Sequence, residues 1–272
     1  MNGTVSKPRW RVVVWPIWVV AALFMLPVLG GAMFAVVVAG SALLLAAVPG
    51  AVPRVETRRS SPDLLVIATM YLAVVGLLRL AFAGFTTANV TGLFLAFAAA
   101  LLVGAAGPII YTVWFRNGSV RDLGLRADNW RTTVALAVLF GGVQFALTLW
   151  GFALPTDPEN WVPLLVMALV VGVFESVFFR GFIQNRLEAQ FGPVVGIAAA
   201  AALYGLYHVG YGMGLTELGF LVGLGVIYAV AFTLARNLFV LWPLLTPLGS
   251  FFANVKAGDI QLPWASILGF AD

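Results

Sequence analysis

The sequence lacks cysteine entirely, and among its 272 residues there is a single histidine, His208. The absence of thiols excludes disulfides, thiolate metal sites and cysteine nucleophiles. A lone imidazole excludes, within one chain, a zinc site built from two or three histidines. Charge is scarce as well, because Asp, Glu, Lys and Arg make up 10% of the residues, against about 25% in an average soluble domain.

Hydrophobic side chains take the place of the missing charge and make up 62% of the residues. Apolar runs long enough to cross about 30 Å of hydrocarbon recur along the chain. We therefore predict an all-α fold, a polytopic transmembrane helix bundle of about eight to nine spans, with the lipid bilayer as a partner. The candidate spans are residues 12–29, 30–50, 64–84, 93–115, 134–154, 163–184, 194–213, 218–235 and 238–256.

The basic residues are distributed unevenly around these spans. All 15 except Arg79 and Lys256 lie before the first span, between spans two and three or four and five, near the end of the sixth, or between spans eight and nine. Positive charge gathers on the cytoplasmic side of membrane proteins, so this pattern predicts a cytoplasmic N-terminus. It also accounts for the net charge of +4 as a topology signal, and we expect no nucleic-acid partner.

The longest polar connection, "RNGSVRDLGLRADNWRTT", divides the chain into parts. We predict an N-terminal transmembrane extension of about four spans over residues 1–115. A cytoplasmic connection then covers 116–133, a core covers 134–256, and a tail covers 257–272. The polar residues that lie within spans are concentrated in the core, so the functional site is expected there.

Three core spans carry polar side chains at similar depth. At 1.5 Å per residue, Glu175 lies roughly 14 Å, His208 about 20 Å and Thr246 about 15 Å from the cytoplasmic ends of their predicted spans. An ionisable residue at this depth costs a few kcal/mol on insertion scales, so it should face protein or a water-filled cavity. We expect the three groups to converge.

The spacing around the sixth span suggests separate roles for its polar residues. Ser176 and Arg180 are four residues apart and share a face of an α-helix. Glu175 and Arg180 are five apart, which places them about 140° apart around an α-helix. We interpret Arg180 as an anchor that reaches toward the aqueous phase rather than as the partner of Glu175.

The seventh and ninth spans each carry a polar stripe at helical spacing. A carboxylate beside an imidazole can take a proton from water and return it to a leaving amine. Hydroxyl and amide donors opposite them can stabilise a tetrahedral oxyanion. Together with Glu175 these groups favour peptide hydrolysis within the membrane. The stripes are Tyr204, His208 and Tyr211 on one span, and Thr246, Ser250 and Asn254 on the other.

At these residues the sequence resembles the CAAX prenyl endopeptidase and bacteriocin-processing family (CPBP, also called Abi), a family of intramembrane metalloproteases. Its first motif, EExxxR followed by Gly, corresponds to the segment from Glu175 to Gly181, and its FxxxH motif to Tyr204-x-x-x-His208. The third motif falls on Thr246-x-x-x-Ser250 after "FVLWPLL". The segment "DLGLR" at residues 122–126 also resembles one that precedes the family core, so the similarity covers about residues 120–255.

The resemblance implies roles for individual residues. Glu175 would be the general base, His208 its catalytic partner, and Thr246 and Ser250 weak oxyanion donors, with Ser176 and Arg180 supporting them. The substrate would be a membrane-associated or lipidated peptide, and the location the inner membrane of a bacterial cell. The family label also implies zinc. A zinc site usually needs three or four protein ligands, so we expect glutamate-activated water without a structural metal and no other cofactor.

The motifs depart from the family pattern at three positions, and alternatives stay open. Ser176 stands in place of the second Glu of the first motif, and Thr246 and Ser250 replace the His and Asn of the third. A family member that has lost proteolysis and acts as a membrane scaffold, immunity or regulatory protein is the main alternative. A transporter with Glu175 as its proton-coupling acid is a third, although the inverted repeats typical of transporters are not visible. Glu175 and His208 could also be polar groups that only pack the core.

Overall fold

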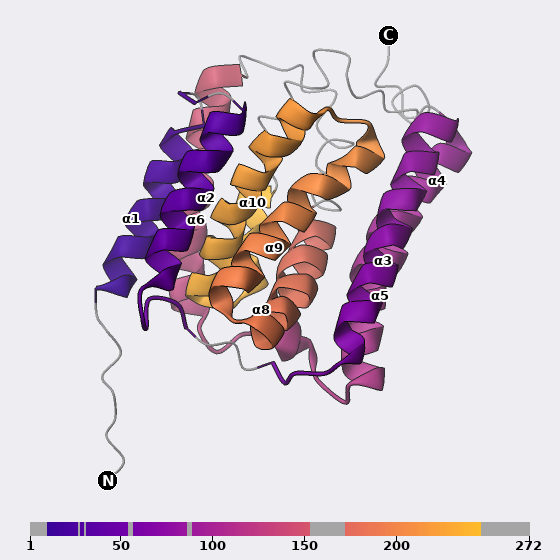
Figure 1. Ribbon diagram of the computed structural model, residues 1–272, viewed down its shortest axis with the longest axis horizontal. Coiled ribbons are helices and arrows are strands. Elements are labelled where there is room, and N and C mark those ends of the chain that lie inside the picture. The colour runs from indigo at the N-terminus through magenta and orange to yellow at the C-terminus, as the bar shows by residue number, and fades with distance from the viewer. Residues whose placement is uncertain are drawn as a thin grey trace.

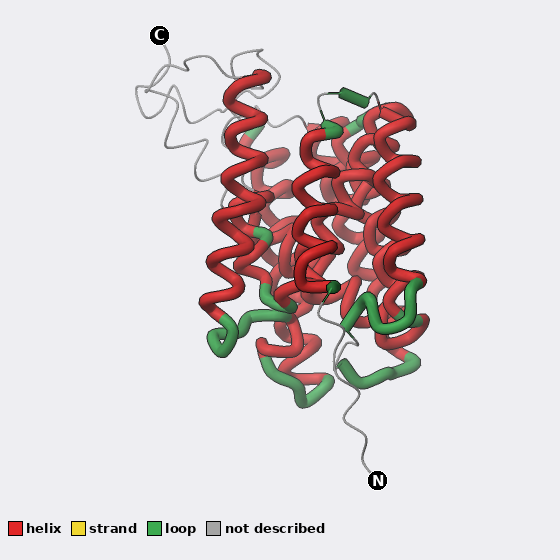
Figure 2. Tube along the Cα trace, turned by 90° about the vertical axis from the view of Figure 1, so that its left-hand side faces the viewer, coloured by secondary structure: helices red, strands yellow, loops and turns green. Residues whose placement is uncertain are grey.

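The computed structural model describes residues 10–26, 28–29, 31–53, 57–85, 89–152 and 172–245. In this part of the chain every regular element is a helix, and the long helices run side by side in one bundle (Figures 1 and 2). The prediction of an all-α helix bundle is confirmed. The α-helices are α1 (Arg11–Phe24), α2 (Gly31–Ala47), α3 (Pro62–Arg79), α4 (Val90–Phe97), α5 (Gly107–Ile110), α6 (Trp130–Phe152), α8 (Asn185–Phe191), α9 (Pro193–Leu206), α10 (Leu215–Ala235) and α11 (Trp242–Leu245).

Several shorter segments with tighter or wider helical winding accompany these α-helices in the described part of the chain, and most of them are continuous with a neighbouring helix. Four are π-helical, with i→i+5 hydrogen bonds, and three are 3₁₀ turns. The π segments are η1 (Leu80–Phe85), η2 (Ala98–Ala106), η3 (Tyr111–Phe115) and η6 (Ser176–Gln184), and the 3₁₀ segments are η4 (Val120–Leu123), η7 (Tyr207–Tyr211) and η8 (Leu238–Val240).

Four continuous helices among the described residues are long and apolar enough to cross a membrane: Pro62–Phe85, Val90–Phe115, Pro193–Tyr211 and Leu215–Ala235. Together with the apolar composition they define a membrane protein. The first two helices of the chain are shorter than predicted, with 14 and 17 residues, because the chain leaves the helix after Phe24 and enters the next one only at Gly31. Of the predicted ninth span, residues 238–256, the structure describes residues 238–245, which contain η8 and α11. Its remainder lies outside the described residues, so the span stays a prediction.

Local signals explain where the long helices begin. Pro62 and Pro193 stand at the first turn of α3 and α9, where a missing N–H costs nothing. Gly192, just before α9, has φ of +87°, a left-handed conformation that favours glycine. The Asn89 side chain accepts a hydrogen bond from the Thr91 N–H at 2.8 Å and so caps α4.

The helix α10 lies at the centre of the bundle and packs against α9, α2 and α1. Glycines permit the closest of these approaches, as in other membrane helix pairs. A Cβ added at Gly225 would lie 2.9 Å from the Ala201 carbonyl oxygen, and one added at Gly205 would lie 2.9 Å from the Val222 nitrogen. On the other side, α3 packs against η7 and η2. The N-terminal helices therefore flank the later ones on both sides (Figure 1).

The helix that carries the first motif ends later than predicted. It runs from residue 172 through η6 and α8 to Phe191, rather than ending near residue 184. Arg186, predicted to mark the end of the sixth span, is consequently buried, with 3% of its surface exposed. Glu175 thus lies farther from the end of its helix than the sequence suggested.

Candidate active site

Glu175 lies at the junction between the α-helical turn at residues 172–175 and the π-helix η6, and it is buried. Both of its carboxylate oxygens accept hydrogen bonds from phenols of the next long helix. Tyr204 donates from its hydroxyl to Oε2 at 3.0 Å, and Tyr207 donates to Oε1. A buried carboxylate needs such donors to be tolerated, and here both come from one neighbouring helix.

His208 lies in η7, the last turn of the helix that carries Tyr204, and is also buried. Its Nδ1 lies 3.0 Å from the Tyr204 carbonyl oxygen. A carbonyl only accepts, so Nδ1 is the protonated nitrogen and Nε2 is left as the acceptor. The imidazole packs against the Tyr207 ring, with 4.0 Å between the ring centroids, and against the Tyr211 ring at 5.5 Å.

Tyr204 and Tyr207 therefore link the two predicted catalytic residues. Within the described residues, no hydrogen bond or ion pair joins Glu175 directly to His208. Both instead contact the same tyrosine pair, Tyr204 through its hydroxyl and carbonyl groups, and Tyr207 through its hydroxyl and ring. The structure brings the acid and the imidazole into one buried cluster, which we call the tyrosine-bridged site: Glu175, Arg180, Tyr204, Tyr207 and His208.

Arg180 belongs to this site, and its interpretation as an anchor reaching toward water is wrong. Its side chain has 0% exposed surface. Its guanidinium carbon lies 5.1 Å from the centroid of the Tyr204 ring, the ring whose hydroxyl binds Glu175. The prediction assumed α-helical spacing, whereas the i→i+5 hydrogen bonds of η6 widen each turn and bring residues five apart closer to one face.

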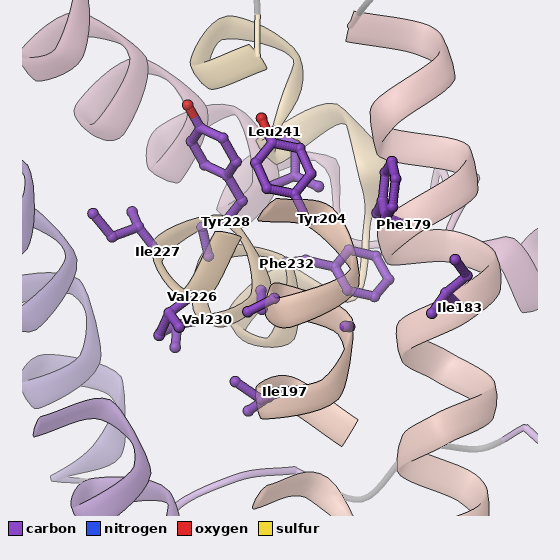
Figure 3. Packing of buried hydrophobic residues seen from close by; sticks show 14 of the residues in the cluster. Phe179, Ile183, Ile197, Tyr204, Val226, Ile227, Tyr228, Val230, Phe232 and Leu241 are labelled. Atoms are coloured by element: carbon purple, nitrogen blue, oxygen red, sulfur yellow. The ribbon is translucent and has the colours of Figure 1, made fainter. Parts of the chain in front are cut away.

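The tyrosines of the site sit within a larger aromatic cluster. The Tyr204 ring packs edge-on against Phe179 of η6 at 5.3 Å and against Tyr228 of α10 at 5.7 Å. Figure 3 shows these three side chains where the three helices meet. The aromatic wall fixes the Tyr204 ring and thereby the hydroxyl that binds Glu175.

The remaining predicted site residues are distributed as follows. Ser176 is buried, and its hydroxyl donates to the Val173 carbonyl oxygen at 3.1 Å, one turn back along its own helix. Thr246 and Ser250, predicted as oxyanion donors, lie outside the described residues, as does Asn254. Their predicted roles stay predictions.

Tyr207 is the functional candidate that the sequence did not single out. In the motif it is merely the residue before the histidine, and on an α-helical wheel it lies near the face of Tyr204 but about 100° from His208. The 3₁₀ winding of η7 begins at Tyr207 and changes that register. The signal that could have revealed it is the density of phenols in "YGLYHVGY", because a buried Tyr hydroxyl usually has a polar partner.

A second buried polar cluster lies at the other end of the first-motif helix. Gln184 donates to Glu188 Oε1 at 2.7 Å and to Thr233 Oγ1 at 3.0 Å. Arg236 pairs with Glu188 at 2.5 Å, and Arg186 donates to Thr112 Oγ1 at 2.7 Å. These groups form hydrogen bonds and an ion pair between three helices, so we assign them a structural role.

The donor set does not fit a closed zinc site. No group of three or more His, Asp or Glu side chains able to hold a metal ion occurs within the described ranges. In the tyrosine-bridged site the Glu175 oxygens are engaged by phenols, and only Nε2 of His208 remains as a nitrogen donor. Three or four protein ligands are usual for zinc, so the residues present do not account for the metal that the family label implies.

These features define a helical membrane protein with a buried acid, an imidazole and a guanidinium at one site. Residues 157–244, about a third of the 272-residue chain, match the family model described as type II CAAX prenyl endopeptidase Rce1-like. The match includes Glu175 and His208, and it confirms the resemblance to CAAX-type proteases drawn from the motifs. No curated protein and no solved structure gives a significant match to the chain.

Proposed function

We propose that this protein is an intramembrane endopeptidase that hydrolyses a membrane-associated or lipidated peptide with a glutamate-activated water. The observation that carries the proposal is the tyrosine-bridged site. Glu175 and His208 come from consecutive helices, both are buried, and both contact Tyr204 and Tyr207. The family match over residues 157–244 supports the same reaction class.

In this proposal Glu175 acts as the general base. A water molecule displaces one phenol from the carboxylate, gives its proton to Glu175, and attacks the scissile carbonyl carbon. The resulting tetrahedral intermediate collapses as the C–N bond breaks, and the proton passes to the leaving amine. The products are a new carboxylate and a new amine, and no other reactant is needed.

His208 has the geometry of a positioning and proton-shuttling partner. The Nδ1–H bond to the Tyr204 carbonyl fixes the ring orientation and leaves Nε2 free to accept a proton from water. Thr246 and Ser250 are proposed as weak donors to the oxyanion. Hydroxyls there carry no charge, so we expect a slower enzyme than one with the family's His and Asn.

We also propose that the protein resides in the inner membrane of a bacterial cell, as a multi-pass protein with a cytoplasmic N-terminus. The distribution of basic residues supports this orientation. Bacteria generally lack prenylated CAAX proteins, so peptide maturation or self-immunity is the expected context.

A second candidate function is a membrane scaffold, immunity or regulatory protein without proteolytic activity. One observation favours it: both oxygens of Glu175 are already engaged by phenols. The replacement of the second motif glutamate by Ser176 points the same way. The two candidates differ in whether the buried acid has to change protonation state.

The test compares Glu175→Gln and His208→Ala with wild type at matched membrane abundance, measuring cleavage of peptides in membranes. Hydrolysis predicts that each variant loses activity by about 10²-fold or more. Glu217→Gln is the matched control, because Glu217 is an exposed acid at the start of α10. Full cleavage in both site variants would overturn the roles proposed for Glu175 and His208, whereas a wild type that cleaves no more peptide than the two variants would favour the scaffold.

A further inference from the structure

Arg180 is a buried cation whose two terminal nitrogens lack a hydrogen-bond partner among the described residues. Its side chain has 0% exposed surface, and its Nη1 and Nη2 atoms make no hydrogen bond to any described residue. Its guanidinium carbon lies over the Tyr204 ring, 5.1 Å from the ring centroid. Leaving a buried charged group without a partner is strongly unfavourable. We therefore expect the guanidinium to bind a hydrogen-bond acceptor.

Glu175 is not that acceptor. Its two oxygens are engaged by Tyr204 and Tyr207, and no ion pair within 4.0 Å links it to Arg180 in the described part of the chain. Arginine can donate two parallel hydrogen bonds to a carboxylate. An external carboxylate would satisfy the Nη1 and Nη2 atoms together.

The sequence explains why Arg180 is unpartnered. The motif EExxxR puts a carboxylate four residues before the arginine, and in the wider turns of the π-helix η6 residues four apart still lie near one face. In this chain that position is Ser176, whose hydroxyl donates instead to the Val173 carbonyl oxygen. The substitution thus removes an internal partner and leaves the guanidinium available.

We propose that Arg180 is a binding site for a carboxylate of the substrate peptide, held beside the acid and imidazole of the tyrosine-bridged site. This inference rests on the proposed function, because it takes the ligand to be a peptide. The carboxylate comes from the peptide's C-terminus or from an Asp or Glu side chain. A guanidinium beside Tyr204 would fix the distance between that anion and the bond that Glu175 attacks.

The depth of Arg180 in the membrane favours a peptide carboxylate over a lipid phosphate as its ligand. Arg180 lies about 16 Å from the end of its helix at Phe191, at 1.5 Å per residue. Phosphates stay at the membrane interface, outside the roughly 30 Å hydrocarbon core. A peptide that enters the site for cleavage reaches this depth, whereas a headgroup does not.

The experiment measures equilibrium binding of fluorescein-labelled, ten-residue apolar peptides to full-length protein in nanodiscs. The protein carries Glu175→Gln so that the peptides are not consumed. One peptide ends in a free carboxylate, a second ends in an amide, and a third ends in an amide but contains one Glu. A charge-assisted bidentate bond predicts that one carboxylate peptide binds about tenfold tighter than the plain amide, or more. Which of the two does so identifies the source of the carboxylate.

Ser176→Glu supplies the decisive variant and Ser176→Gln its control of equal size. The new glutamate pairs with Arg180 inside the chain, so we expect the preference for the carboxylate to disappear in Ser176→Glu and to persist in Ser176→Gln. Equal binding of all three peptides, or an unchanged preference in Ser176→Glu, overturns the inference. Either result leaves the protease proposal standing if wild-type protein cleaves the peptides and Glu175→Gln does not.

Discussion

At the scale of single residues, the site depends on two phenol hydroxyls that hold one carboxylate. Tyr204 and Tyr207 are the donors to Glu175, and they also frame His208. Their hydroxyls therefore fix the position of the carboxylate that we propose as the general base.

Tyr207→Phe removes one donor while keeping the aromatic ring against His208. A hydrogen bond to a charged group contributes about 1.5–3 kcal/mol, so we expect kcat/KM for peptide cleavage to fall about tenfold or more. The control is Tyr71→Phe, which removes a phenol that donates to the Leu203 carbonyl oxygen at 3.0 Å, away from the acid. Equal activity of both variants would show that the Tyr207 hydroxyl does not serve the acid.

The residues that form the site could be predicted from the sequence better than the contacts between them. An acid and an imidazole at similar depth in consecutive spans were enough to predict that Glu175 and His208 converge. The contact of Tyr207 with Glu175 was not predicted, although Tyr207 lies three residues after Tyr204 in a segment dense in phenols. The burial of Arg180 could not be predicted, because it depends on a local departure from α-helical winding in η6. Such departures shift a side chain around the helix axis. No residue pattern in η6 or η7 predicts them.

At the scale of elements, the first-motif helix is held in place by the segment that precedes the core. The Leu238 N–H donates to the Gly124 carbonyl oxygen at 2.9 Å, and Asn185 donates to the Asp122 carbonyl oxygen at 3.1 Å. Gly181 faces the Leu123 carbonyl so closely that a Cβ there would clash with backbone. The segment "DLGLR" thus braces η6 six residues beyond Glu175.

Gly181→Ala is expected to destabilise this contact. Backbone cannot yield as a flexible side chain can, and overpacking costs typically about 1–3 kcal/mol. Gly40→Ala is the matched control, because Gly40 is also helical but has open space within 4 Å of its Cβ position. Thermal unfolding of the purified protein in detergent measures both. A midpoint in Gly181→Ala as high as in Gly40→Ala would contradict the bracing role.

Element boundaries show where hydrophobic runs suffice as evidence and where they do not. The runs at 64–84, 194–213 and 218–235 predicted Pro62–Phe85, Pro193–Tyr211 and Leu215–Ala235 to within a few residues. Proline or glycine lies at or next to several ends of these helices. The end of the sixth helix was predicted too early, because the helix continues through polar residues that resemble a helix end: Gln184, Asn185, Arg186 and Glu188. Tertiary pairing of these side chains keeps the segment helical and buried.

At the scale of the whole molecule, the account requires one orientation across the membrane. The cysteine-free sequence allows this to be tested with single introduced thiols. Asn117 lies in the connection before η4, and Leu215 begins α10 and is 88% exposed. If the N-terminus is cytoplasmic, we expect Asn117→Cys to react with an impermeant maleimide only after the cells are opened.

Leu215→Cys should show the opposite behaviour and react in intact cells, because it lies at the other end of the 21-residue helix α10 from Arg236. Wild type has no thiol and serves as the blank. Labelling of Asn117→Cys in intact cells, together with protection of Leu215→Cys, would reverse the proposed topology.

The most direct test of the central claim is to cleave a membrane peptide with purified protein in H₂¹⁸O and analyse the products by mass spectrometry. If Glu175 activates water, wild type places one ¹⁸O in the new carboxylate, while Glu175→Gln yields neither cleavage nor label at equal protein abundance. Cleavage and labelling by Glu175→Gln at the wild-type rate would contradict the account.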